Sequence, residues 1–284
     1  MGGESRSRIR LSDVNGSLSE ALRTAFAADE AAALVTLAEV KGSTPREAGA
    51  AMVVSERSVT GTIGGGTIEW DAIAIARGML AGVVDREVVR RALGPDLGQC
   101  CGGHVTIVVE RATAESLTML VAREDEERSR LRPITIYGAG HVGRALARAL
   151  DPLPFRTRIV DARGTEIDAV TASRVDRIVG SCTAVAESAE PGGGHVVLTH
   201  SHALDSLVCA SLLERGDFMY LGLIGSATKR ATFVRAFRDL DISEERIARL
   251  VCPIGGTAVR DKRPAVIAAL VAAEIVATFL GGGD

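Results

Sequence analysis

Hydrophobic positions follow two different periods along the first part of the chain. Apolar runs predict strands at 32–40, 51–56 and 104–110. Helical spacing predicts a helix at 18–29 and a second one within 61–80, whose buried face would carry Ile68, Ala72, Ile75, Ala76 and Met79. The segment 86–93 is too short for either assignment. Together these elements predict a smaller N-terminal α/β domain over residues 1–112.

From residue 133 onward, apolar runs alternate regularly with helical segments. The predicted strands are 134–140, 156–163, 175–180, 195–200 and 218–225, and the predicted helices are 141–150, 203–215, 226–240 and 261–280. Strands that alternate with helices form parallel sheets, because a parallel pair needs a crossover connection. We therefore expect a Rossmann-type domain with a parallel sheet over 133–284. The charged stretch within 113–132 predicts either a linker between the two domains or the solvated end of a helix, and the sequence favours neither.

A glycine motif follows the first predicted strand of the second domain. Gly138, Gly140 and Gly143 fit G-x-G-x-x-G between a strand and a helix, and Asp161 ends the next strand. In dinucleotide-binding folds, these glycines allow a tight turn, close approach of a phosphate and packing of the helix on the strand. We predict a cofactor site here that includes His141. Asp161 would either bind a ribose hydroxyl or cap a loop.

Two further loops after predicted strands carry candidate binding residues. His200 and His202 lie at the sheet edge where such folds bind ligands, although they could instead cap the helix that follows. If Ser226 is an N-cap, Lys229 and Arg230 lie in the first helical turn, where cations oppose the helix dipole and favour a nearby anion. We predict that this basic pair helps to hold a phosphate; the alternative is a solvent-exposed pair.

Three consecutive glycines, Gly64–Gly66, precede the second predicted helix of the N-terminal domain. Successive backbone N–H groups in such a run can form an anion-binding nest. The same glycines could serve only to make a tight bend, and the sequence favours neither reading.

Two adjacent cysteines, Cys100 and Cys101, lie between glycines in the stretch LGQCCGGH. Glycine neighbours leave the sulfur atoms accessible, which suits metal capture or sulfur handling. Zinc ligands are usually spaced by two or more residues, so a zinc site with His104 fits poorly. A vicinal disulfide that senses redox state is a further alternative. The remaining cysteines are expected to be buried small apolar residues: Cys182, Cys209 and Cys252.

Charge and composition exclude several classes of function. The 284 residues include 33 basic and 36 acidic side chains, with a net charge of −3 and no concentrated basic run, so we expect no nucleic-acid partner. No apolar run reaches the roughly 18–20 residues of a membrane span, and the first residues lack the apolar stretch of a signal peptide. Five cysteines without an export signal predict a cytoplasmic protein with reduced thiols.

A series of motifs, in order along nearly the whole chain, resembles the XdhC/CoxI family and within it the accessory proteins of xanthine dehydrogenase. The motifs are GSTPREAGAAM, GTIGGGTIEWDAIAIAR, LGPDLGQCCGGHV, IYGAGHVGRAL, LTHSHALD, GLIGSATKRATF and CPIG followed by DKRPAVIAALVAAEI. The resemblance implies a chaperone rather than an enzyme, with the molybdenum cofactor (molybdopterin) as cargo. It further implies protection of the cofactor while a cysteine desulfurase-type donor supplies sulfur, and insertion into apo xanthine dehydrogenase or a related molybdenum hydroxylase.

The resemblance also implies roles for individual residues. Cys100 and Cys101 match the paired cysteines of the family and would bind the molybdenum centre, and the glycine motif matches its Rossmann loop. After the acidic residue that corresponds to Asp161, members of the family often continue with an arginine and Phe-Pro. This chain reads DARGTEIDAV, with Arg163 but without Phe-Pro. The resemblance therefore does not imply the shape of the loop that follows Asp161. A homodimer is compatible with the family. The alternative function is an NAD(P)-dependent oxidoreductase, although NAD(P) is not the expected cofactor.

Overall fold

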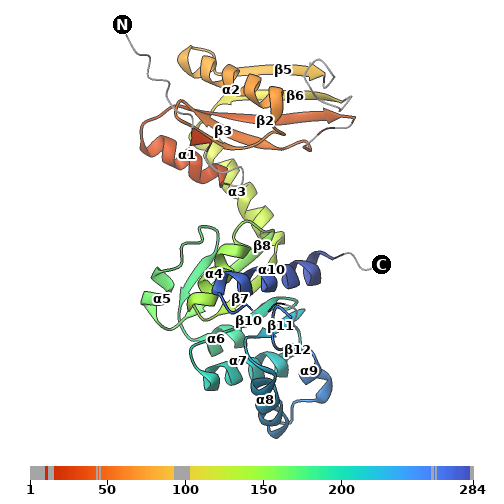
Figure 1. Cartoon of the computed structure of the whole chain (residues 1–284). Coiled ribbons are helices and arrows are strands. Elements are labelled where there is room, and N and C mark those ends of the chain that lie inside the picture. Colours follow the sequence, from red (N-terminus) through yellow and green to blue (C-terminus); the bar gives the residue numbers. More distant parts are fainter. Residues whose placement is uncertain are drawn as a thin grey trace. The chain divides into compact units, whose positions relative to one another are not determined.

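The computed structural model describes residues 10–11, 16–42, 44, 46–92, 103–256, 259 and 261–281. The chain divides into two compact units, Met1–Glu127 (unit 1) and Arg128–Asp284 (unit 2), each built on its own sheet (Figure 1). Helix α3 (Ala114–Arg130) occupies most of the segment predicted as a linker, and its Leu120 packs in a core of unit 1. None of the helices in the described ranges combines the length and the apolar surface that crossing a membrane requires.

The sheet of unit 1 is antiparallel except for one pair of strands. Its order is β1-β4-β3-β2-β6-β5, and β1 pairs with β4 in parallel. The strands are β1 (Arg10–Leu11), β2 (Ala32–Lys41), β3 (Ala51–Ser55), β4 (Ser58–Gly61), β5 (Arg86–Ala92) and β6 (His104–Arg111). The strands predicted at 32–40, 51–56 and 104–110 are confirmed. The undecided segment is β5, which is last in the sheet order and mostly exposed, so its apolar alternation is weak.

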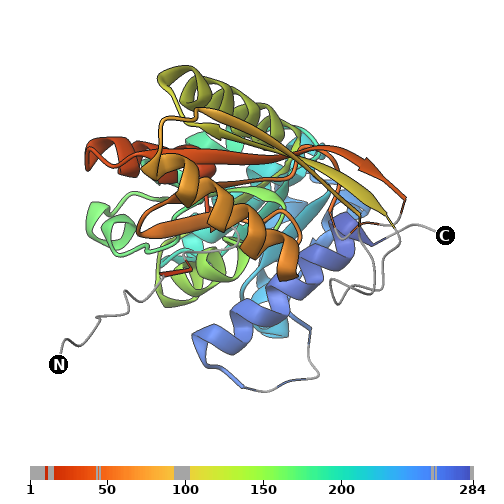
Figure 2. The ribbon, with the colours of Figure 1, turned by 90° about the horizontal axis from the view of Figure 1, so that it is seen from above.

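Helices cover both faces of this sheet. Helix α2 (Gly66–Ala81) lies across one face (Figure 2), where Val35, Leu37 and Val109 pack against it. Its buried residues are Ile68, Ala72, Ile73, Ala76 and Met79. Ile73 therefore takes the buried place that the spacing assigned to Ile75, which is half-buried. Helix α1 (Leu18–Ala27) packs with α3 in a separate core on the opposite face.

The sheet of unit 2 is parallel throughout, as predicted. Its order is β12-β11-β10-β7-β8-β9, which reads 6-5-4-1-2-3 within this unit, the arrangement of dinucleotide-binding Rossmann folds. The strands are β7 (Arg132–Tyr137), β8 (Phe155–Asp161), β9 (Asp176–Val179), β10 (Gly194–Val197), β11 (Tyr220–Leu223) and β12 (Leu250–Val251). The order reverses between β7 and β10, which places the expected ligand crevice at their carboxyl ends.

Helices cover both faces of this second sheet (Figure 1). They are α4 (His141–Leu150), α5 (Gly164–Asp168), α6 (Cys182–Glu187), α7 (His202–Arg215), α8 (Ala227–Asp239), α9 (Glu244–Ala248) and α10 (Pro264–Leu280). Helices α4 and α10 contribute to one apolar core, and α6, α7 and α8 contribute to the other. Cys182 and Cys209 are buried as predicted, whereas Cys252 is half-buried.

A buried Tyr–His pair connects β7 and β10, and its Tyr137 belongs to the second of these cores. The Tyr137 hydroxyl lies 3.2 Å from His195 Nδ1, and His195 is 2% exposed. Burial, aided by the positive charges of Arg158 and Arg215, lowers the pKa of His195 from 6.5 to about 4. The folded protein therefore resists protonation of this ring over a range of pH in which the unfolded chain accepts the proton.

We expect this difference in pKa to make stability depend on pH. The contribution of His195 is complete above pH 6.5 and is lost as the pH falls towards about 4, since the unfolded state binds more protons in this window. The loss amounts to about 2–3 kcal/mol. Urea unfolding of the wild type and of His195→Gln between pH 7 and pH 4 measures it. An equal pH dependence in the two proteins would contradict the prediction.

Candidate functional site

The glycine motif lies where β7 passes into α4, beside the loop that follows β10. Gly138 has a φ of +113°, and a Cβ atom there would lie 2.5 Å from the Leu198 carbonyl oxygen. A Cβ atom at Gly143 would overlap the Gly138 carbonyl oxygen. Both positions therefore require glycine. Gly138 allows the loops after β7 and β10 to approach each other, and Gly143 allows α4 to pack on the turn that precedes it.

Gly140 has a different environment from the other two glycines of the motif. No heavy atom of the described residues lies within 4 Å of a Cβ position at Gly140, so the space beside it is open. Gly140 is the N-cap of α4 and has no side chain to satisfy the first N–H groups, and the first turn contains no acidic residue. An anion at this helix terminus would meet unpaired N–H groups and the positive end of the helix dipole. His141, the first helical residue, is exposed beside it.

Asp161 caps the glycine loop from the end of β8. Its Oδ2 accepts from Ala139 N at 2.9 Å and from Arg163 Nη2 at 2.7 Å, and its Oδ1 accepts from Arg163 N and Nε at 3.0 and 2.9 Å. Burial would raise the pKa of this carboxyl, but the hydrogen bonds from Arg163 and Ala139 outweigh it and hold the pKa well below its usual range. Of the two roles left open by the sequence, the geometry is that of the loop cap.

A second buried carboxylate, Asp205, links the loops that follow β10 and β11. Its Oδ1 accepts from Thr199 N at 2.8 Å and from Thr199 Oγ1 at 2.7 Å, and its Oδ2 accepts from Lys229 Nζ at 2.6 Å. Lys229 also donates to the Ile224 carbonyl oxygen at 3.0 Å. The side chains of Asp205 and Lys229 are 1% and 13% exposed. The anion beside Lys229 is thus a carboxylate of the chain itself, while Arg230 is half-buried and has no ion-pair partner among the described residues.

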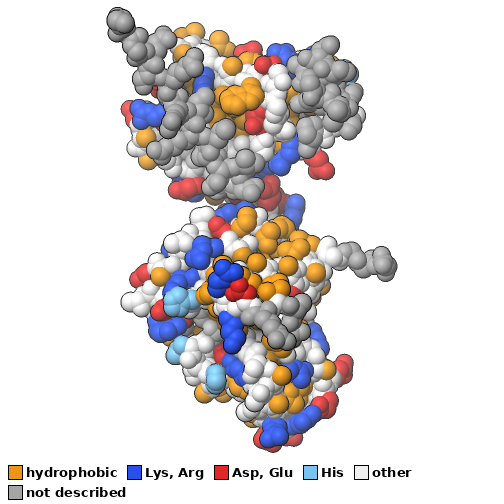
Figure 3. All heavy atoms as spheres, in the orientation of Figure 1, with side chains coloured by type: hydrophobic (Ala, Val, Ile, Leu, Met, Phe, Trp, Pro, Cys, Tyr) orange, Lys and Arg blue, Asp and Glu red, His pale blue; other side chains and the backbone are white. Residues whose placement is uncertain are grey.

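His200 and His202 lie at this same edge of the sheet. Ser201 is the N-cap of α7 and accepts from Leu204 N at 3.4 Å, so the alternative in which the histidines cap the helix is wrong. Figure 3 shows exposed histidine side chains beside Lys and Arg side chains on one face of unit 2. Within the described ranges, no three His, Cys, Asp or Glu side chains are placed to hold a metal ion.

The glycine run of unit 1 is also closed by a carboxylate of the chain. Glu69, in the first turn of α2, accepts from Ile63 N at 3.0 Å and from Gly65 N at 3.1 Å through Oε2, which the Thr62 hydroxyl also contacts. The geometry is that of an anion nest occupied by Glu69. The paired cysteines Cys100 and Cys101 lie outside the described residues, three and two positions before Gly103.

The sequence interpretation missed the residues that organise these loops. Asp205 and Thr199 lie inside the LTHSHALD motif, where only the histidines were considered, and Glu69 lies in the motif that contains Gly64–Gly66. In both motifs an acidic residue follows shortly after a strand and its loop, and this pattern could have indicated a carboxylate that stabilises the loop. Their partners could not be read from the sequence, because Asp205 and Lys229 are 24 residues apart.

Comparison with known proteins identifies the family. Residues 25–92 match the XdhC and CoxI family, and residues 134–275 match the XdhC Rossmann domain. The chain is 28% identical over 250 residues to the uncharacterized protein YqeB of Escherichia coli K12, covering 86% of this chain but only 43% of that protein. A crystal structure from Bacillus halodurans described as a xanthine dehydrogenase shares the fold, with a TM-score of 0.66, 18% identity and coverage of 95% of this chain and 97% of that one. The chain therefore belongs to the XdhC and CoxI family.

Proposed function

We propose that this protein is an accessory chaperone that carries the molybdenum cofactor in its molybdopterin form. It protects this cargo while a cysteine desulfurase-type donor supplies the terminal sulfur, and it inserts the cargo into apo xanthine dehydrogenase or a related molybdenum hydroxylase. The observation that carries the proposal is membership of the XdhC and CoxI family, which implies a role in the maturation of molybdenum hydroxylases. The protein has no turnover of its own in this proposal.

The chemistry of the cargo matches two features of the chain. Its metal end favours soft sulfur ligands, which suits the adjacent thiols of Cys100 and Cys101. Its phosphate suits the N-terminus of α4, where Gly140 leaves open space and the first N–H groups lack a capping side chain.

Other predicted site residues fall into two roles in this proposal. His200 contacts the cargo from the loop after β10, and His141 and Arg230 contact it from the first turns of α4 and α8, since each side chain is at least partly exposed there. Asp161 and Lys229 act indirectly, because their hydrogen bonds to Arg163, Ala139 and Asp205 hold those loops in place.

An NAD(P)-dependent oxidoreductase is the alternative that the strand order of unit 2 suggests. The state of Asp161 disfavours it. Four donors already occupy the acceptor positions of this carboxylate, and a carboxylate has about four such positions. A ribose diol would have to displace Arg163 to reach Asp161, so NAD(H) binding in the usual Rossmann manner is expected to be weak.

Binding measurements on the purified protein test the proposal. Isolated molybdenum cofactor should bind to the wild type, and Cys100→Ala/Cys101→Ala and Gly140→Asp should each weaken binding by about tenfold or more, since each removes a charge-assisted contact or adds a repelling charge. Cys209→Ala, a change at a buried thiol on α7, is the matched control and should bind as the wild type does.

The outcomes separate the two functions. Saturable binding of NAD(H), together with cofactor binding that both variants leave unchanged, would refute the chaperone proposal and favour the oxidoreductase. Transfer of bound cofactor to apo xanthine dehydrogenase, measured as recovered activity of that enzyme, would then extend a positive binding result to insertion.

A further inference from the structure

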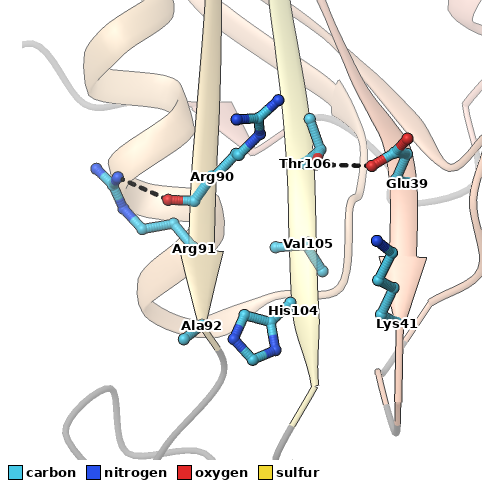
Figure 4. Close-up of a pocket in the computed structure, with 8 residues that line it drawn as sticks. All are labelled: Glu39, Lys41, Arg90, Arg91, Ala92, His104, Val105 and Thr106. Carbon is cyan, nitrogen blue, oxygen red and sulfur yellow. Dashed lines mark hydrogen bonds between the residues drawn. The ribbon is translucent and has the colours of Figure 1, made fainter.

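A cavity of unit 1 lies on the sheet where β2 and β5 end and β6 begins (Figure 4). Its volume is about 400 Å³, and the polar side chains that line it are Glu39, Lys41, Arg90, Arg91, His104 and Thr106. None of them belongs to the glycine motif or to the loops of unit 2. A cavity of this size lies within the range of roughly 300–1,000 Å³ that small-molecule sites occupy.

The register of the sheet brings all of these side chains except that of Arg91 onto one face. His104 on β6 is paired with Lys41 on β2 and with Ala92 on β5, and Thr106 is paired in the same way with Glu39 and Arg90. Residues two apart on one strand point to the same side of a sheet. Lys41 and Arg90 therefore extend from the two strands that flank β6, as Figure 4 shows.

A β-bulge in β2 places two of these residues on that face. The register shifts between Leu37 and Glu39, and after the shift Val40 packs in the core under α2. Without the extra residue, Glu39 would follow Leu37 onto the core side. Bulges commonly re-aim side chains beside functional sites, and this one turns Glu39 and Lys41 towards the cavity.

The cations of the cavity are only partly neutralised. Arg91 points to the other face of the sheet, where it lies 3.9 Å from Asp71 of α2. Glu39 accepts a long hydrogen bond of 3.4 Å from Thr106. Lys41 and Arg90 have no ion-pair partner in the part of the chain that the structure describes, so two cations share the cavity with one carboxylate.

This imbalance distinguishes the cavity from three other places where the chain could hold an anion. Glu69 fills the glycine nest of unit 1, and in unit 2 Asp161 and Asp205 neutralise Arg163 and Lys229. At each of those places a carboxylate of the chain already occupies the position of an anion. In the cavity the described residues supply two cations, an imidazole, a hydroxyl and one carboxylate, so one positive charge is not balanced by them.

We infer that this cavity binds a phosphate group, either free orthophosphate or the phosphate monoester of a small molecule. Arginine and lysine donors favour phosphate oxygens through charge-assisted hydrogen bonds, and the volume leaves room for an organic part attached to the phosphate. Ala92 and His104 both line the cavity, and Cys100 and Cys101 lie between these two residues in the sequence. The inference goes beyond the proposed function and does not require it.

Titrations of the full chain followed by backbone ¹⁵N NMR test this inference. The probes are orthophosphate and phenyl phosphate, at ionic strength held constant with chloride. Arg90→Gln and Lys41→Gln should each weaken binding by about tenfold, since each removes a charged donor. Glu39→Gln should strengthen binding by about threefold, because it removes a like charge. Loss of structure cannot produce this opposite sign.

Arg86→Gln is the matched control, because Arg86 lies on the same strand but pairs with Glu110 outside the cavity. It should leave the affinity unchanged. Binding of both probes, with shifts at the amides of residues 39–41, 90–92 and 104–106, supports a site for either phosphate source, and binding of phenyl phosphate alone supports the ester. Equal losses in Arg90→Gln and Arg86→Gln, or shifts confined to the amides of Gly140 and His141, would overturn the inference.

Discussion

Asp205→Ala should lower the free energy of unfolding by about 3–5 kcal/mol, the cost of leaving a buried charge without its partner. The substitution leaves the ammonium group of Lys229, whose side chain is only 13% exposed, without its counter-charge. It also removes the acceptor of the Thr199 amide and one of the two acceptors of the Thr199 hydroxyl. Urea unfolding followed by circular dichroism at pH 7 measures the loss, which should appear as a lower midpoint with an unchanged slope.

Two controls make this prediction specific. Asp205→Leu/Lys229→Met removes both charges and should recover most of the stability, because an apolar pair of similar volume replaces a buried ion pair with little loss. Glu20→Ala breaks an ion pair with Arg23 whose side chains are 50% and 68% exposed, and it should cost less than about 1 kcal/mol. If the double variant is as unstable as Asp205→Ala, the Asp205–Lys229 ion pair is not the cause.

Gly138→Val should destabilise the protein by at least about 3 kcal/mol. A β-branched residue at a φ of +113° is strained, and its Cβ would meet the Leu198 carbonyl oxygen at 2.5 Å, a backbone atom that cannot turn away as a side chain does. The loops after β7 and β10 would have to separate. Thermal unfolding of the purified variant measures the effect.

Gly140→Ser is the matched control within the same motif. Open space surrounds the Cβ position, and Gly140 has the extended backbone of an N-cap, so serine should change stability by less than about 1 kcal/mol in either direction. Similar melting temperatures for Gly138→Val and the wild type would contradict the role assigned to Gly138. A large loss in Gly140→Ser would show that the space beside α4 is not open.

The loops around the glycine motif are held by the chain's own carboxylates. Asp161 fixes the turn after β7, and Asp205 fixes the turns after β10 and β11. Because these charges are satisfied internally, the open positions at this edge are the N-terminus of α4 and the exposed side chains around it. This arrangement suits the binding of a phosphate at the N-terminus of α4 better than the binding of a ribose hydroxyl, which would need a carboxylate without other partners.

The strands, the Rossmann-type unit and the glycine motif could be predicted because their signals are local. Alternating apolar runs and helical spacing reflect the burial of single elements, and Gly138, Gly140 and Gly143 lie close together in the sequence. The prediction was wrong where burial depends on a neighbour, as at Ile73, and it left the segment of β5 unassigned because exposure weakens the pattern there. The motifs quoted for the family extend over both units and agree with the comparisons.

The sequence by itself determined the α/β class, the parallel sheet of unit 2, the family and the adjacent thiols of Cys100 and Cys101. Only the tertiary structure decided which charges meet. Asp205 reaches Lys229 across 24 residues, and the bulge in β2 brings Glu39 beside Thr106 across 67. The physical reason is that a salt bridge or a strand register depends on how distant segments pack. Neither produces a periodic pattern of residues in the sequence from which it could be predicted.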